Sequence, residues 1–413
     1  MRSVLNISKH DGIGRRFNNL DARPGFLTHG WDAKFACWTG RTESEEYVQQ
    51  AGWSLTHSLT PWMAKLGRRT GNVNGLYRNA CAITGLEFYR AADLLHFHIV
   101  HEEYLSVDDW VKIAARKPLV WTWHDPYMLS GHCIHPLDCD GFESGCIRCP
   151  NLHYHFPVKR DRSARNLEEK LRVVKKLDPM VIVASDYMRE LVARSVYENE
   201  VRIRVVPFGV DMDRGLNQAE AKRSLGIPER NIVIGFRADY SIYKGLSLVQ
   251  NALHRLSTRY PDLPITVIAF QEMGSCTGLS RRYQIIETGW IKGAEIGAYY
   301  SAMDYFLMPS VAEAFGLMAI EAMAAGATPI VTIGTALPSL VGAPEYGLCS
   351  EHFDDAYADT VETAILRVDR NAERRGARQD FARNHYNMSE FCKELAGIYD
   401  EEIEYSHSVR RAA

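Results

Sequence analysis

Short apolar runs alternate along this chain with amphipathic stretches, and polar or glycine-containing loops separate them. Apolar runs of this kind are typical of parallel strands that are buried on both faces by helices. Their alternation with helical patterns predicts an α/β protein with parallel sheets. We expect strands at residues 1–7, 32–38, 94–100, 119–123, 180–185, 201–206, 231–236, 265–270, 285–291, 304–310 and 329–331.

The helical patterns lie between these runs. A glycine-containing loop at Asp11-Gly12-Ile13-Gly14 leads into an expected helix near Arg15. The stretch from Gly40 to Gly75 has no clear period, and we expect it to be an irregular, polar insertion. Further helices are expected at residues 159–176, 187–195, 293–303, 317–325 and 389–405, and one is expected directly after Lys244-Gly245.

Length and composition narrow the class of protein. A chain of 413 residues is too long for one core and suits two domains. The formal net charge of −3 argues against nucleic acid as the partner. No apolar run is long enough to span a bilayer, and the N-terminus lacks the apolar core of a signal peptide. We therefore expect a cytoplasmic protein whose nine cysteines are thiols or metal ligands.

The stretch from Asp304 to Ile330 carries the strongest chemical signal. A buried strand is followed by a loop with Glu313 and by a helix that begins after Phe315-Gly316 and carries Glu321. Ligands of open α/β sheets bind outside the carboxyl ends of strands, where the N–H groups of Gly316 and Leu317 could hold a phosphate. Two carboxylates beside a phosphate site suit the hydroxyl groups of a sugar nucleotide. The alternative is an ordinary strand–loop–helix unit with two solvated glutamates.

This stretch resembles the signature of the retaining glycosyltransferases of family 4. The matching residues are Pro309-Ser310, Glu313, Phe315-Gly316, Glu321-Ala322-Met323-Ala324 and Gly326. The resemblance implies a GT-B fold, which consists of two facing Rossmann-like domains. It also implies that Glu313 holds the hydroxyls of the transferred sugar and that Glu321 holds the ribose of the donor.

Three other segments extend the resemblance to the donor site. Gly12 and Gly14 correspond to a glycine-rich loop that faces the donor phosphates, although a plain strand-to-helix turn remains an alternative. Arg237 and Lys244 resemble the pair that binds the diphosphate, and their residue types suit that ligand. Pro207-Phe208-Gly209-Val210-Asp211 resembles the joint between the two domains, with Phe208 in place of the usual asparagine.

The first domain is expected to hold the acceptor. His124 follows a strand at its carboxyl end, and its match to a family histidine implies contact with the transferred sugar. The insertion at residues 40–75 is a candidate acceptor loop, because long insertions in compact domains often bind ligands. Its aromatic and basic residues are Trp53, Trp62, Lys65, Arg68 and Arg69. A solvated loop pinned by its tryptophans is an equal alternative.

Four cysteines lie close together in the sequence at residues 131–157. Cys133, Cys139, Cys146 and Cys149 are spaced as Cys-x5-Cys-x6-Cys-x2-Cys, which suits a closed tetrahedral zinc site. Histidines 132, 135, 153 and 155 are substitute ligands. A site with four thiolates leaves no open position, so the zinc would be structural. Two disulfides or four unrelated thiols are the alternatives.

The segment around the cysteine loop also indicates which subgroup of the family the chain resembles. The segment Val120-Trp121-Thr122-Trp123-His124-Asp125 and the later Gly131-His132-Cys133 are similar to a subgroup of family 4 that builds colanic acid and related bacterial exopolysaccharides. Residues 159–176 then hold eight basic and three acidic residues. A basic helix face here would be attracted to an anionic membrane, although a solvated face is the favoured alternative.

Together these observations predict a retaining glycosyltransferase that needs no catalytic metal. The donor is a UDP- or GDP-type nucleotide sugar, the acceptor is a glycan or a lipid-linked glycan, and the enzyme is cytoplasmic or peripheral at the inner face of the membrane. We expect an acceptor domain at residues 1–206, a donor domain at 207–385 and a crossover helix at 386–413 that returns to the first domain. The alternatives are a zinc-stabilised binding protein without catalysis and a sugar-nucleotide epimerase on the same fold.

Overall fold

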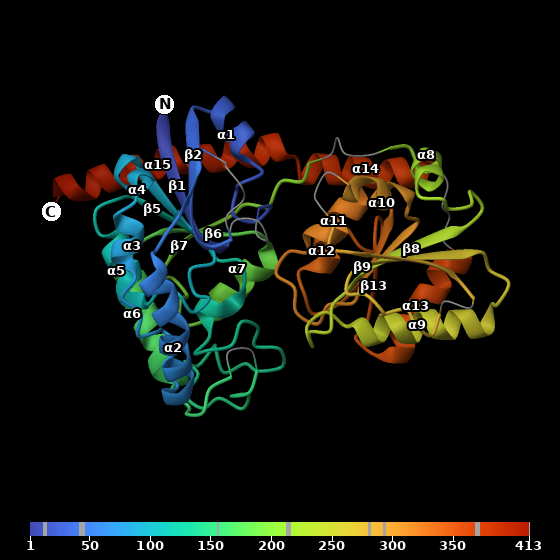
Figure 1. Cartoon of the computed structure of the whole chain (residues 1–413), viewed down its shortest axis with the longest axis horizontal. Helices are drawn as coiled ribbons and strands as arrows, with labels where there is room; N and C mark the ends of the chain where they lie inside the picture. The colour runs from blue at the N-terminus through green and yellow to red at the C-terminus, as the bar shows by residue number, and fades with distance from the viewer. Residues whose placement is uncertain are drawn as a thin grey trace. The chain divides into compact units, whose positions relative to one another are not determined.

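The chain folds into two compact units. The computed structural model describes residues 1–10, 15–40, 46–154, 157–211, 216–279, 282–291, 295–367 and 372–412. Unit 1 consists of Met1–Gly209 and Met388–Ala413, and unit 2 consists of Val210–Asn387 (Figure 1). The expected donor residues Gly12 and Gly14 lie outside the described residues.

Unit 1 is built on one parallel sheet. Its strand order is β3-β2-β1-β4-β5-β6-β7. The strands are β1 (Arg2–His10), β2 (Trp31–Thr39), β3 (Val48–Gln50), β4 (Leu94–Phe97), β5 (Leu119–Thr122), β6 (Met180–Val183) and β7 (Arg202–Val205). The helices are α1 (Arg23–Thr28), α2 (Ser54–Thr70), α3 (Ala80–Thr84), α4 (Glu87–Ala91), α5 (Val107–Ala114), the 3-10 helix η1 (Pro126–Leu129), α6 (Ser163–Leu177), α7 (Asp186–Ala193) and α15 (Met388–Ala412).

Unit 2 is also built on a parallel sheet, with strand order β10-β9-β8-β11-β12-β13. The strands are β8 (Ile232–Ala238), β9 (Ile265–Gln271), β10 (Gln284–Gly289), β11 (Tyr305–Met308), β12 (Thr328–Thr332) and β13 (Leu348–Ser350). The helices are α8 (Gln218–Ser224), α9 (Leu246–Arg259), α10 (Ile296–Ala302), α11 (Leu317–Ala324), α12 (Leu337–Leu340), α13 (Asp354–Arg367) and α14 (Ala372–His385). Helices α9 and α13 pack together over the strands, and α11 packs against α14 and α10. The sheet is therefore covered by helices, as its apolar strands require.

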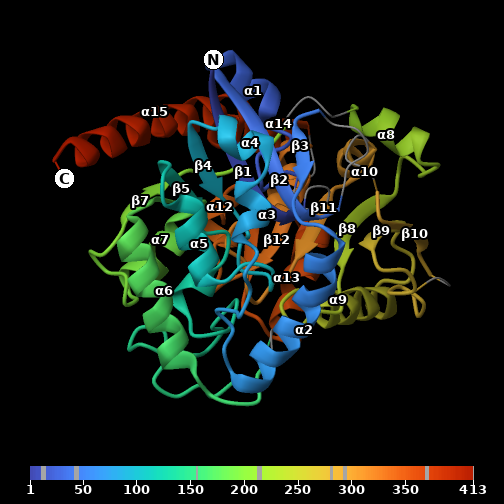
Figure 2. The ribbon, with the colours of Figure 1, turned by 60° about the vertical axis from the view of Figure 1, so that its left-hand side comes forward.

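The α/β class and the expected strands are confirmed, with strand ends that differ by about three residues or fewer. The crossover helix is confirmed as well. Helix α15 belongs to unit 1, where it packs against α1, and Figure 2 shows it beside that helix. None of the described helices is both long and apolar enough to cross a membrane.

Two expectations about local structure were wrong. The helix expected near Arg15 begins only at Arg23, because turns occupy residues 15–22 and Asn19 takes a left-handed conformation with a φ of 70°. Nearly half of the stretch expected to be irregular forms α2, a helix of 17 residues that contains Pro61. The large apolar residues of α2 recur at helical spacing but lie on its exposed side, and Pro61 and Gly67 interrupt the pattern, whereas the inward face carries small residues such as Thr60 and Ala64.

Candidate functional site

The direction of strand order reverses between β8 and β11 in unit 2, which is where open α/β sheets bind ligands. The loops that leave these two strands carry Lys244 and Glu313. Lys244 Nζ lies 2.8 Å from Glu313 Oε2, and the two side chains are 22% and 16% exposed. The structure therefore brings together two residues that are 69 positions apart in the chain and that the sequence assigned to the donor site.

The backbone holds this pair in place. Gly245 has a φ of +64°, and a Cβ atom there would lie 2.1 Å from the carbonyl oxygen of Pro309. Only glycine allows the loop after β8 to come this close to the end of β11. The N–H of Val311 donates to Tyr243 O (3.0 Å), and the N–H of Ala336 donates to Glu313 O (3.1 Å). Three loops at this edge of the sheet are thus tied together around the ion pair.

Helix α11 begins beside the pair. Its N-cap residue Gly316 has a φ of 91°, and the side chains of Phe315 and Leu317 are buried. Phe315 packs edge-on against Tyr386 with ring centroids 5.9 Å apart. The buried side chains anchor the start of the helix, so only backbone N–H groups of these residues are placed to meet an anion.

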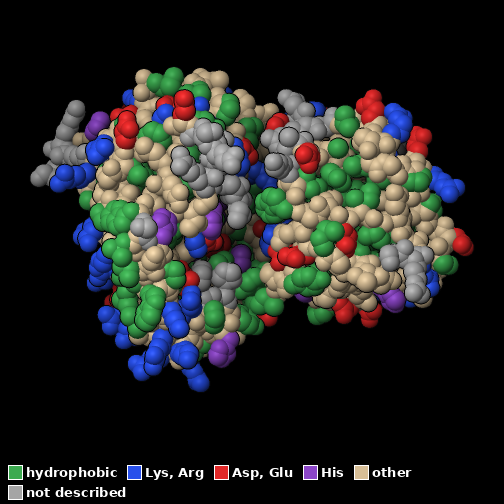
Figure 3. All heavy atoms as spheres, in the orientation of Figure 1, with side chains coloured by type: hydrophobic (Ala, Val, Ile, Leu, Met, Phe, Trp, Pro, Cys, Tyr) green, Lys and Arg blue, Asp and Glu red, His purple; other side chains and the backbone are tan. Residues whose placement is uncertain are grey.

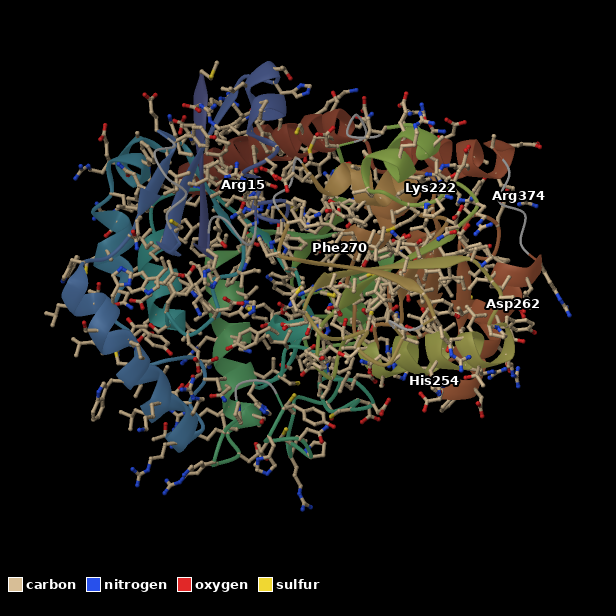
Figure 4. All side chains as sticks on the ribbon, turned by 45° about the vertical axis from the view of Figure 1, so that its right-hand side comes forward. Arg15, Lys222, His254, Asp262, Phe270 and Arg374 are labelled. Atoms are coloured by element: carbon tan, nitrogen blue, oxygen red, sulfur yellow. The ribbon has the colours of Figure 1, made fainter. Side chains whose placement is uncertain are left out.

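Glu321 lies further along α11 and has a defined neighbour. Tyr300 Oη donates a hydrogen bond of 3.0 Å to Glu321 Oε2. The ring of Tyr300 packs against Phe270 at the end of β9, with centroids 5.6 Å apart; Figure 4 labels Phe270. The tyrosine therefore positions the carboxylate expected to hold the ribose, a partner that the sequence did not predict.

Arg237, the last expected donor residue, is held by its neighbours. Its Nε donates to Gln271 Oε1 (2.7 Å), and its terminal nitrogen lies 2.9 Å from Asp239 Oδ2. The side chain is 38% exposed. An ion pair of this exposure is weak, so the guanidinium could exchange Asp239 for a diphosphate.

A second polar cluster lies at the reversal of strand order in unit 1, between β1 and β4. His98 directly follows β4, and His124 lies two residues after the end of β5. His98 Nδ1 is 3.1 Å from His124 Nε2, and His98 Nε2 is 2.9 Å from Asn6 Oδ1. The sequence identified His124 but neither of its partners. Their signal was weak, because the sheet order and not the spacing brings these residues together.

The hydrogen bonds determine the tautomers of both histidines. The Asn6 side-chain nitrogen donates to Lys34 O (3.3 Å), so its Oδ1 faces His98. A carbonyl oxygen only accepts, so His98 Nε2 carries the proton. The Nδ1 of a neutral His98 then accepts, and His124 donates through Nε2. His124 Nδ1 is left as a buried acceptor with no partner among the described residues.

The pKa values support neutral rings in this cluster. Burial lowers the pKa of His98 well below its usual value, and His96 and His124 lower it further. Burial also lowers the pKa of His124 to about 4, although the nearby Asp125 opposes this shift. Phe208 stacks on the ring of His124 with an interplanar angle of 9°. The residue that replaces the usual asparagine of the joint thus forms an aromatic wall for His124.

Unit 1 also contains a small hollow, and two of its lining residues, His101 and Tyr127, follow His98 and His124 by three positions in the chain. It is lined by residues of α2, of the segment between α2 and α3, of the loop after β4 and of η1, including Arg68, Tyr77, His101, Glu103 and Tyr127. Arg68 contacts both carboxylate oxygens of Glu103, one at 2.6 Å. The hollow combines an ion pair with aromatic rings and has room for about one water molecule.

The four cysteines of residues 131–157 line another hollow in unit 1, together with His132. The Gly141 N–H donates to Cys139 Sγ and the Asn151 N–H to Cys149 Sγ, each at 3.4 Å. All nine cysteines of the chain are free thiols. Lys170 belongs to the basic segment 159–176, whose basic face the sequence predicts to be exposed. That prediction was wrong for this residue, because Lys170 is fully buried and its Nζ donates to Tyr127 O and Ser130 O.

The cysteine hollow brings together residue types that can bind a metal, four thiols and His132. Burial raises the pKa of the Cys133 thiol to about 11, and it also raises the pKa values of Cys146 and Cys149. In the described residues, no group of three or more His, Cys, Asp or Glu side chains is arranged to hold a metal ion. The thiols are gathered but do not converge, so a structural zinc at this position stays a prediction.

Comparison with known families gives two adjacent matches. The model of Glycosyltransferase Family 4 matches residues 27–214, and the model of Glycosyl transferases group 1 matches residues 217–386. These ranges follow the two units closely, with the second match on unit 2.

Individual relatives agree with the family matches. WcaC of Escherichia coli K12, named as a colanic acid biosynthesis glycosyl transferase, is 32% identical over 34% of this chain and 36% of its own length. D-inositol 3-phosphate glycosyltransferase of Salinispora arenicola is 33% identical over 61% of this chain and 57% of its own length. The chain thus spans about a third of the first relative and just over half of the second.

Solved structures share the whole fold. Sucrose-phosphate synthase from Thermosynechococcus elongatus superposes with a TM-score of 0.68 at 16% identity, covering 97% of this chain and 99% of that one. HepE from Anabaena, in complex with UDP and glucose, gives a TM-score of 0.66 at 17% identity over 97% and 100% of the two chains. Likeness at these identities shows the fold, which is that of the GT-B glycosyltransferases.

Proposed function

Since this chain belongs to the family 4 glycosyltransferases, with a group 1 domain in its second half, we propose that it transfers a sugar from a nucleotide sugar to a glycan or lipid-linked acceptor with retention of configuration. The observation that carries the proposal is the Lys244–Glu313 ion pair beside the start of α11. It brings a cation and a carboxylate together beside the first turn of α11, at the end of the sheet where open α/β folds bind ligands.

In this proposal unit 2 binds the donor. Lys244 and Arg237 contact the diphosphate together with the first N–H groups of α11, and Glu321 binds the ribose. Glu313 accepts hydrogen bonds from hydroxyls of the transferred sugar. Solved relatives of this fold hold UDP or UDP-glucose, which supports a nucleoside diphosphate at this edge. UDP and GDP donors both suit these contacts.

The proposed chemistry depends on the leaving group. The bond between the anomeric carbon and the diphosphate oxygen breaks, and its electron pair leaves with the diphosphate. The acceptor hydroxyl forms the new bond from the same face of the sugar and gives its proton to a phosphate oxygen. Lys244 and the helix N–H groups then stabilise the charge that develops on the diphosphate, without a catalytic metal.

We propose that unit 1 contributes His124 and the acceptor site. His124 Nδ1 is an acceptor, so it would receive a hydrogen bond from a hydroxyl of a bound ligand. The Arg68–Glu103 ion pair near His101 would offer polar contacts to the acceptor at the mouth of the small hollow. The Escherichia coli relative is named for colanic acid biosynthesis, which favours an acceptor from exopolysaccharide synthesis. We propose that the enzyme works at the inner face of the membrane.

A panel of nucleotide sugars tests the function. The melting temperature should rise with one nucleotide sugar, because a ligand at about 100 times its Kd adds roughly 2.7 kcal/mol of stability. The same donor should then yield a glycosylated product only when acceptor is present. Release of nucleotide and an epimerised sugar without acceptor would instead identify an epimerase. No stabilisation by any nucleotide sugar would favour a binding protein without catalysis.

A further inference from the structure

The outward face of α2 in unit 1 is apolar. Leu55, Leu59, Trp62 and Leu66 are 61%, 47%, 77% and 48% exposed. At about 100° per residue they fall within an arc of about 60° on one side of the helix. We call these four residues the α2 stripe. The opposite side of α2 carries the buried residues Thr60, Ala64 and Gly67.

This arrangement inverts the usual amphipathic pattern, in which large apolar residues face the core. The helix rests on the unit through small side chains and presents leucines and a tryptophan to solvent. Contiguous apolar surface of this kind marks an interaction site in most soluble proteins. Figure 3 shows hydrophobic side chains along this edge of unit 1, with Lys and Arg side chains gathered near the lower end.

Cations border the stripe. Lys65 and Arg69 are exposed on α2 itself. The segment that precedes α6 lies against the end of α2, because the Lys159 N–H donates to Arg68 O at 3.0 Å. A Cβ atom at Gly71 would lie 2.2 Å from Arg160 O, which shows how closely the two segments approach. The exposed cations that border the stripe, here called the basic rim, are Lys65, Arg69, Lys159, Arg160 and Arg162.

The residue types of the α2 stripe and the basic rim indicate which kind of partner binds this surface. Leucines insert into the acyl region of a bilayer, tryptophan prefers the level of the headgroups, and lysine and arginine attract anionic lipids. An acidic protein partner would match the rim but would not require an exposed tryptophan beside leucines on one helix. We propose that α2 lies in the surface of an anionic membrane, with the α2 stripe inserted and the basic rim against lipid phosphates.

This surface differs from the one that the sequence suggested on α6. The exposed cations of α6 are partly neutralised, since Arg165 pairs with Glu169 and Lys175 pairs with Glu200. Lys170 of α6 is buried, so it is not part of an exposed basic face. The α2 surface is therefore the better candidate, and it would hold unit 1 where a lipid-linked acceptor is found. That consequence rests on the proposed function, whereas membrane binding itself does not.

Vesicle co-sedimentation tests the surface with the full-length chain. We expect binding to vesicles of phosphatidylcholine with about 30% phosphatidylglycerol and at least tenfold weaker binding to phosphatidylcholine alone. The triple variant Leu59→Ser, Trp62→Ser, Leu66→Ser should bind at least tenfold more weakly. The matched control is Phe353→Ser in unit 2, a side chain 67% exposed, which should bind as the wild type does.

Charge reversal separates the two candidate faces. Lys65→Glu with Arg160→Glu should remove the preference for anionic vesicles, and Arg172→Glu with Lys176→Glu on α6 should leave it unchanged. The opposite result would transfer the docking surface to α6. Equal binding by the triple variant and the wild type would overturn the proposal. A concentration-dependent dimer that the triple variant loses, without vesicle binding, would identify the stripe as a contact between copies instead.

Fluorescence gives a direct readout of insertion. Lipids brominated in the acyl chain should quench wild-type tryptophan emission, and Trp62→Phe should bind similarly but lose most of the quenching. Each variant should also keep its thermal stabilisation by the nucleotide sugar. This last measurement separates a failure of membrane binding from a failure of the donor site.

Discussion

Replacing Glu313 with glutamine should strengthen nucleoside diphosphate binding while it nearly abolishes transfer. In the structure Glu313 holds Lys244 at 2.8 Å, and both side chains are mostly buried. A diphosphate that binds Lys244 must compete with this carboxylate and must also approach its negative charge. Glutamine keeps the shape of the side chain and removes the charge. Transfer should fail because the hydroxyls of the sugar lose a strong acceptor.

The size of the effect follows from the ion pair. A hydrogen bond to a charged group contributes about 1.5–3 kcal/mol. At 1.36 kcal/mol per factor of ten, its release should tighten the binding of UDP or GDP by roughly tenfold to a hundredfold. Lys244→Met should weaken the same binding by a similar factor, since it removes the cation that the phosphates contact.

Isothermal titration with UDP and with GDP, at a fixed salt concentration of about 0.15 M, measures these affinities. Glu351→Gln is the matched control, because it removes an exposed carboxylate from the same unit. Nucleotide binding by Glu313→Gln that is equal to or weaker than wild type would refute the competition between carboxylate and diphosphate. Unchanged binding by Lys244→Met would show that this lysine does not contact the diphosphate.

Three further predictions concern unit 1. Between pH 6.5 and about 4 the unfolded chain protonates His124 while the folded site does not, so stability should fall as pH is lowered through this window, by about 3 kcal/mol for this group; melting curves of His124→Gln should show a smaller fall. His98→Phe removes the acceptor for His124 Nε2–H and should lower kcat by tenfold or more, with UDP or GDP affinity unchanged by titration. Metal analysis under reducing conditions should find about one zinc per chain, lost on serine substitution of any loop cysteine and kept in Cys276→Ser; a metal-free protein with titratable loop thiols would contradict the zinc site.

The sequence predicted the local structure from β11 to α11 well because its signals are local. One short segment contains a buried strand, a glycine at the helix start and two glutamates. Each of these can be recognised from its neighbours in the sequence alone. The pairing of Glu313 with Lys244 could be expected once both loops were assigned to neighbouring strands. The role of Tyr300 could not, because its distance from Glu321 depends on how α10 packs against α11.

The features that the sequence missed depend on contacts between distant segments. Asn6, His98 and His124 meet only because β4 lies between β1 and β5 in the sheet. Helix α2 was missed because Pro61 and Gly67, which usually mark turns and loops, interrupt the helical spacing of its large apolar residues. Lys170 was placed on the surface because lysine is rarely buried, and only the two carbonyl oxygens it contacts explain its position.

The return of α15 to unit 1 has a consequence for synthesis of the chain. Unit 1 is interrupted after Gly209 and resumes only at Met388, so its last helix emerges after the whole of unit 2. That helix supplies Tyr399, whose hydroxyl lies 2.7 Å from His96 Nδ1 in the centre of the unit. At about 5–20 residues per second, the ribosome needs roughly 10–35 s to add the intervening residues. During this time the nascent first unit exposes the surface that α15 later covers.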